Sequence, residues 1–145
     1  MSRSTSAFNV TTHTISAAHL REYPQGTTSG YLNVPRLKLS VNHYVPRANR
    51  SQDHKPTDLT IVFGHANGFH RELYEPYFDD LLKRLQAQGL VVRGIWVAEA
   101  AHQGWSGVLN EEYLGNDPSW NDYARDIVSA SPIVLGISNA ENRRI

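Results

Sequence analysis

The chain has 145 residues, of which 40% are hydrophobic, and this is enough for one domain with a modest core. Its 14 basic and 14 acidic residues cancel, and no cluster of Lys and Arg stands out, which argues against nucleic acid or an anionic membrane surface as a partner. The absence of cysteine excludes a disulfide framework, a thiolate nucleophile and a cysteine-ligated zinc site.

Two segments in the first third of the chain alternate apolar and polar residues. They are FNVTTHTI at 8–15 and LKLSVNHYV at 37–45, and this alternation predicts two half-buried antiparallel strands at the edge of a sheet. The segment between them is punctuated by Pro and Gly and is expected to form a loop. Residues 46–58 are expected to form a polar connector.

The next three elements alternate strand, helix and strand. The continuous apolar run at 59–63 is typical of a central strand buried on both faces. A helix is expected to begin near Glu75 and Pro76 and to end at Gly89, with one apolar stripe formed by Tyr77, Leu81, Leu82 and Leu85. A second buried strand is expected over 90–98.

The last third of the chain predicts a second helix and a third strand. Ser119 is the expected N-cap, and the apolar face of the helix is expected to be Trp120, Tyr123, Ala124, Ile127 and Val128. The apolar run at 132–135 is interpreted as a third buried strand. Strands and helices alternating at this spacing predict a parallel sheet with right-handed crossovers.

The segment GHANGF at 64–69 follows directly after a predicted strand. A turn of small residues there lets backbone N–H groups face a cavity at the carboxyl end of the sheet. In α/β-hydrolases this loop donates one N–H of the oxyanion hole, and by position the donor is assigned to Asn67, with Ala66 second. His65 is then expected to orient the loop. The alternative is a plain strand-to-helix turn with a satisfied histidine.

The segment GISNA at 136–140 is a degenerate nucleophile elbow, which makes Ser138 the candidate nucleophile. Two features depart from the motif, since Ala140 replaces the second Gly and Ile137 stands where a His is usual. Seven residues follow Ser138 in the given sequence, and none is Asp or His. The alternative is therefore a serine in a frayed terminus.

No metal site or cofactor is predicted. The histidines His65, His70 and His102 fall near one expected sheet edge, but no HExxH or comparable pair accompanies them, so they are interpreted as scattered loop histidines. Residues 64–68 lack the glycine spacing of a phosphate-binding loop.

Four separated blocks carry a resemblance to a family. They are HLREYP, GHANGFHRELYEPYFDDLL, RGIWVAEAAHQG and PSWNDYARDI, between His19 and Leu135. Together they resemble the fungal α/β-hydrolases of secondary-metabolite gene clusters, which include the hydrolases of host-selective AK-, AF- and ACT-toxin biosynthesis and the peroxisomal acyl-CoA hydrolase of mycophenolic acid biosynthesis.

The resemblance implies an α/β-hydrolase fold, a Ser-Asp/Glu-His triad and hydrolysis of a small-molecule acyl ester or thioester in the making of a polyketide-like acid. Family members continue from the third strand into Gly-x-Ser-x-Gly, whereas here the sequence after about Gly136 is unlike theirs. The expectation is thus one incomplete domain over residues 1–145, the N-terminal half of the fold. A catalytically inactive truncated copy and a non-catalytic binding module are the alternatives.

The expected location is intracellular. The N-terminus has no apolar signal region, and no segment approaches the length of a membrane span. The resemblance implies the peroxisome, but the last three residues, Arg143 to Ile145, are not a Ser-Lys-Leu signal, so the cytoplasm is the alternative.

Overall fold

The computed structural model describes residues 5–28, 36–48 and 55–134. In chain order its elements are the strands β1 (Phe8–Ser16), β2 (Lys38–Pro46) and β3 (Leu59–Gly64), the helix α1 (Glu75–Ala87), the strand β4 (Val92–Ala98), and the helices α2 (Gly104–Leu109) and α3 (Trp120–Val134). Two short 3-10 turns lie at Pro24–Gly26 and Arg71–Tyr74. No helix in this part of the chain is both long and apolar enough to cross a membrane.

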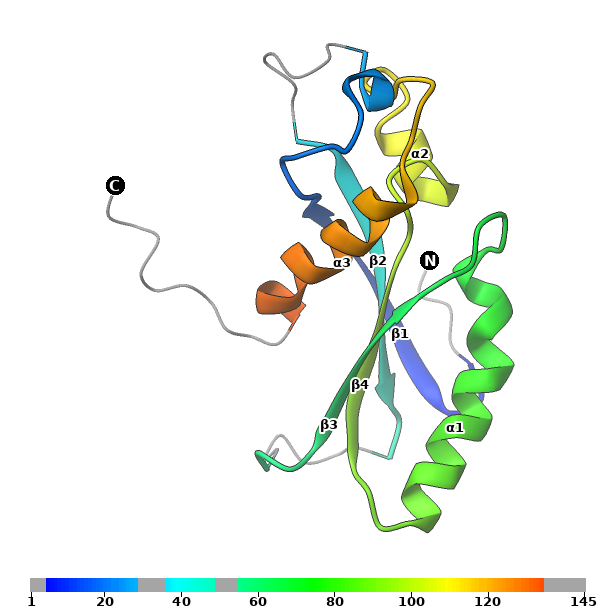
Figure 1. Ribbon diagram of the computed structural model, residues 1–145. Helices are drawn as coiled ribbons and strands as arrows, with labels where there is room; N and C mark the ends of the chain where they lie inside the picture. The colour runs from blue at the N-terminus through cyan, green and yellow to red at the C-terminus, as the bar shows by residue number, and fades with distance from the viewer. Residues whose placement is uncertain (1–4, 29–35, 49–54, 135–145) are drawn as a thin grey trace.

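The four strands form one mixed sheet in the order β1-β2-β4-β3. β1 pairs antiparallel with β2, and β2 pairs antiparallel with β4. β3 and β4 are parallel, and α1 forms the crossover between them (Figure 1). These pairings confirm the predicted antiparallel pair and the predicted strand-helix-strand unit.

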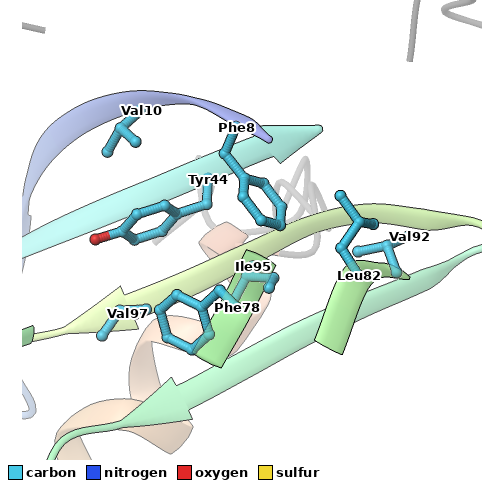
Figure 2. Close-up of a cluster of buried hydrophobic side chains, with 8 residues drawn as sticks. All are labelled: Phe8, Val10, Tyr44, Phe78, Leu82, Val92, Ile95 and Val97. Atoms are coloured by element: carbon cyan, nitrogen blue, oxygen red, sulfur yellow. The ribbon is translucent and has the colours of Figure 1, made fainter. Parts of the chain in front are cut away.

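The sheet is covered by α1 on one face and by α3 on the other. Successive side chains of β4 alternate between the two faces, so each helix packs against a different set of them. Ile95 and Val97 pack with Phe78 and Leu82 of α1. Figure 2 shows this apolar cluster, to which Phe8, Val10, Tyr44 and Val92 also belong. On the other face, Trp96 and Ala98 belong to a second cluster with Ile127 of α3. The core is therefore built in two layers around one sheet.

The helix α1 begins and ends where the sequence predicts. Pro76 lies in its first turn, and Gly89 follows its C-cap. The predicted stripe was wrong at one end, since Tyr77 is exposed and Phe78 is completely buried. Phe78 contacts the rings of both Tyr44 and Phe63, whereas the exposed Tyr77 reaches this cluster at its edge, at Phe63, so the buried stripe is rotated by one residue at this end.

β3 is not the central, doubly buried strand that its composition predicts. It pairs with β4 on one side and lies at the edge of the sheet in the described part of the chain. Its side chains are half-buried or exposed throughout. An apolar edge of this kind is a surface that another strand can pair with.

The helix α3 corrects two predictions. It runs through Val134, so residues 132–134 are helical and the predicted third strand is wrong there; Leu135 lies outside the described residues. Its buried face also differs from the predicted one, because Ala124 is exposed, and Trp120 and Val128 are 50% and 71% exposed. The acidic residues Asp122 and Asp126 are buried in their place.

Those two buried carboxylates hold the loop that precedes β2. Asp126 accepts a hydrogen bond from the Ala18 N–H at 2.8 Å and pairs with the guanidinium of Arg21. Asp122 accepts from the Glu22 N–H at 2.8 Å. Backbone N–H groups and an arginine satisfy carboxylates that would otherwise be costly to bury, which explains an acidic buried face.

Candidate functional site

The predicted oxyanion loop lies at the carboxyl end of the parallel strand pair. β3 ends at Gly64, which pairs with Ala98 at the end of β4. The residues after Gly64 therefore lie beside the residues after Ala98. In open α/β sheets, ligands bind at this edge.

His65 is buried, and both ring nitrogens contact the backbone. The Ala100 N–H donates to Nε2 at 3.1 Å, and Nδ1 lies 2.9 Å from the Ala66 carbonyl oxygen. Because a backbone N–H can only donate, Nε2 is the acceptor, and this assigns the proton to Nδ1, which donates to the carbonyl. These contacts favour the structural role predicted for His65, since neither nitrogen is left for proton transfer.

Two tyrosine hydroxyls fix the start of the loop. The Tyr123 hydroxyl accepts from the His65 N–H at 2.9 Å and donates to the Ala98 carbonyl at 2.8 Å. Burial raises the pKa of Tyr123 to about 12, so it remains a donor at neutral pH. The Tyr74 hydroxyl accepts from the Ala66 N–H at 3.0 Å.

The centre of the loop is a tight turn from Ala66 to Phe69. The Phe69 N–H donates to the Ala66 carbonyl at 3.1 Å, and Gly68 has a φ of +74°. This hydrogen bond and this positive φ at the third residue are the pattern of a type II turn. Asn67 is then the second residue of the turn.

The two predicted donors differ in availability. The Ala66 N–H is used by Tyr74, whereas the Asn67 N–H has no protein acceptor among residues 5–28, 36–48 and 55–134. Asn67 is also exposed. Of the two candidates, Asn67 is thus the one whose N–H is free for a ligand.

Two hollows that share part of their lining form a groove beside the loop. One, of about 280 Å³, is lined by His65, Gly68, Phe69 and Gln103. The other, of about 490 Å³, is lined by Glu72, Leu73, Trp105 and Val108. Both share His70, Glu99 and Gly104. The groove therefore has a polar end at the loop, and its other end, at α2, adds the apolar side chains of Leu73, Trp105 and Val108.

The buried ion pair of Arg71 and Glu99 borders the groove. The two side chains are 2% and 4% exposed, and Arg71 Nε lies 3.5 Å from Glu99 Oε1. Arg71 also donates to Ser40 Oγ at 3.0 Å, and the Ser106 N–H donates to Glu99 Oε2 at 3.2 Å. At Gly104, where φ is +52°, a Cβ would overlap the Glu99 carboxylate, so glycine is required there.

Sequence reasoning missed this pair, although one signal pointed to Glu99. A carboxylate directly after a buried strand, at the edge where ligands bind, is an unusual residue choice. Arg71 lies within one of the quoted sequence blocks, but nothing local distinguishes it from an exposed arginine.

The other predicted site residues are placed as follows. Ser138 lies outside the described residues. In the described part of the chain, no three His, Asp or Glu side chains gather as metal ligands. Within the same part, no serine hydroxyl bonds to a histidine beside the groove.

Comparison with known proteins gives relatives but no family model that matches the chain. The chain is 40% identical over 126 residues to the "Type I acyl-CoA thioesterase mpaH" of Penicillium brevicompactum, a match that covers 86% of this chain and 27% of that protein. It is 26% identical over 129 residues to the "Peroxisomal membrane protein LPX1" of Saccharomyces cerevisiae, covering 89% of this chain and 32% of that protein.

A solved structure shows the fold. The "Peroxisomal alpha-beta-hydrolase Lpx1" of Saccharomyces cerevisiae superposes with a TM-score of 0.72 and 27% identity, over 95% of this chain and 36% of that one. The chain thus has the fold of part of an α/β-hydrolase and is related to a fungal acyl-CoA thioesterase. It spans about a quarter to a third of the length of these relatives.

Proposed function

We propose that this relative of a fungal acyl-CoA thioesterase forms the oxyanion-binding part of a serine hydrolase that acts on acyl thioesters. The observation that carries the proposal is the Asn67 N–H. It has no protein acceptor in the described residues, and it lies in a loop that Tyr74 and Tyr123 fix at the carboxyl end of two parallel strands. In α/β-hydrolases a backbone N–H from this loop binds the oxyanion.

The proposed chemistry is acyl transfer to a serine and then to water. The serine Oγ attacks the thioester carbonyl while a histidine takes its proton, and the carbonyl oxygen becomes an oxyanion. The Asn67 N–H and the N–H of the residue after the serine donate to that oxygen. The intermediate then collapses to an acyl-enzyme while the protonated histidine gives its proton to the leaving thiolate; water, deprotonated by the same histidine, next attacks the acyl-enzyme and releases the acid and the serine. Ser138 remains the predicted nucleophile, and Ala66 the second candidate donor.

The groove supports an acyl substrate. Its polar end lies at the loop, where a thioester carbonyl would react, and its other end offers the apolar side chains of Leu73, Trp105 and Val108, which are all at least 60% exposed. An acyl chain that covered these side chains would remove apolar surface from water. The thioester class itself comes from the name of the Penicillium relative.

Three finer points are also proposed. The described elements belong to one domain, whose sheet continues beyond the open edge of β3. The reaction serves secondary metabolism, with toxin biosynthesis as the specific case that the sequence blocks predict. The location is the peroxisome, which the name of the yeast relative supports.

A chimera tests the proposed function. In the chimera, the matching part of this chain would replace the matched 126-residue segment of the Penicillium brevicompactum thioesterase. The rest of the enzyme would come from the Penicillium protein. We expect saturable hydrolysis of an acyl-CoA above background, measured by release of the free thiol. A folded chimera that binds acyl-CoA without hydrolysing it would contradict the proposal and favour the binding module.

A further inference from the structure

The side chain of Gln103 reaches across to the loop after β3 and contacts two consecutive residues. Its Oε1 accepts from the Gly68 N–H at 3.0 Å, and its Nε2 donates to Asn67 Oδ1 at 2.6 Å. One amide group therefore holds both the N–H of the Asn67–Gly68 peptide and the side chain of Asn67.

The orientation of this amide follows from its neighbours. The Gly68 N–H can only donate, which assigns the oxygen of Gln103 to it. The nitrogen then lies between Asn67 Oδ1 and His102 Nε2, at 3.2 Å from the latter. Burial, and secondly the neighbouring His65, lowers the pKa of His102, so at neutral pH its ring is uncharged and Nε2 can accept.

The backbone of Gln103 is itself anchored by hydrogen bonds. Its N–H donates to the Ala100 carbonyl at 2.9 Å, and as the N-cap of α2 its carbonyl accepts from the Gly107 N–H at 2.9 Å. Asn110, at the other end of α2, donates through Nδ2 to the Ala101 carbonyl and to the Lys38 carbonyl of β2. The glutamine thus projects from a short helix that is anchored to the sheet.

Packing does not hold the turn in its place. A Cβ at Gly68 would meet no atom within 4 Å, and Asn67, Gly68 and Phe69 are all exposed. Among the described residues, the hydrogen bonds from Gln103 are thus the contacts that tie the Asn67 side chain and the Gly68 N–H to the rest of the fold, while Tyr74 and His65 hold the preceding Ala66.

We propose that Gln103 is a positioning residue, which fixes the Gly68 N–H and the Asn67 side chain and thereby holds in place the residue Asn67, whose own N–H lies in the preceding Ala66–Asn67 peptide. That Gln103 supports an oxyanion-binding residue rests on the proposed function. That Gln103 fixes the Gly68 N–H can be tested without any turnover.

The test is hydrogen–deuterium exchange of the full chain, read by mass spectrometry with fragmentation that resolves the Gly68 amide. Gln103→Met keeps the length of the side chain but removes the acceptor, and should speed exchange at Gly68 by about five- to tenfold, the loss of one ordinary hydrogen bond. Gln103→Glu restores an acceptor, and Asn67 can turn its amide to donate to it. This variant should return exchange at Gly68 to nearly the original rate.

Gln86→Met is the matched control, since Gln86 is an exposed glutamine on α1. It should leave Gly68 unchanged. Exchange at Gly68 that is unaffected by Gln103→Met, or equally fast in the Met and Glu variants, would overturn the inference. A chimera without thioesterase activity would contradict the proposed function alone, because the exchange result does not depend on hydrolysis.

Discussion

Asn67→Pro in the chimera should lower kcat for acyl-CoA hydrolysis by about 10²–10³-fold, the cost of removing one oxyanion-hole donor. Proline has no N–H, yet it is favoured at the second residue of a type II turn, which is the place of Asn67 between Ala66 and Gly68. The substitution therefore deletes the donor while the turn can persist. Steady-state kinetics with an acyl-CoA measure the effect.

Asn67→Ala is the control for this prediction. It keeps the N–H and removes only the side-chain contact with Gln103 Nε2, so it should cost far less in kcat than the proline variant. Near-identical losses in the two variants would show that the side chain or the stability of the loop matters rather than the N–H. A proline variant with unchanged kcat would remove Asn67 from the oxyanion hole.

Arg71→Met should destabilise the chain by about 3–5 kcal/mol, because it leaves the carboxylate of Glu99 buried without its cation. A loss of this size is a large fraction of the stability of an ordinary domain. Urea denaturation followed by circular dichroism measures it. The variant also removes the hydrogen bonds from Arg71 to Ser40 Oγ and to the half-buried Glu72, which add smaller terms.

The double variant Arg71→Met with Glu99→Met separates the cost of an unpaired charge from the cost of lost packing. With both charges absent, the double variant should be more stable than Arg71→Met alone. A single variant that loses less than about 1 kcal/mol would place the pair among the weak, solvated ion pairs. A double variant less stable than the single one would show that the Glu99 carboxylate is held mainly by the Ser106 N–H.

The elements with strong local patterns could be predicted from the sequence. The alternation of apolar and polar residues predicted the bounds of β1 and β2 to within about a residue, and Pro76 and Gly89 marked the ends of α1. Residues 132–134 were misassigned, because a short apolar run fits a buried strand and a helix equally well. Here it continues α3.

Burial was harder to predict than secondary structure. The composition of β3 indicates a strand buried on both faces, but its place in the sheet depends on which strands pair with it, and here only β4 does so in the described residues. The face of α3 was misjudged because Asp122 and Asp126 are satisfied by residues about 100 positions earlier in the chain. Such distant partners leave no local signal.

In the candidate site too, features with a local sequence signal could be predicted, and features set by distant contacts could not. The loop at Asn67 was identified because it follows directly after a strand and consists of small residues. Gln103 and Glu99 were missed because their importance lies in contacts with Gly68 and Arg71, which are about 30 residues away in sequence. Spacing along the chain indicates where a ligand can bind, whereas the side chains that hold the binding groups emerge only from the fold.

The most direct measurement is a crystal structure of the chimera with an alkyl phosphonate bonded to the catalytic serine, which mimics the tetrahedral intermediate. The account predicts that the phosphonyl oxygen lies about 2.7–3.1 Å from the backbone nitrogen of Asn67, the distance of an oxyanion-hole hydrogen bond. A phosphonyl oxygen that is bound by other donors, with the Asn67 nitrogen beyond hydrogen-bond distance, would contradict it.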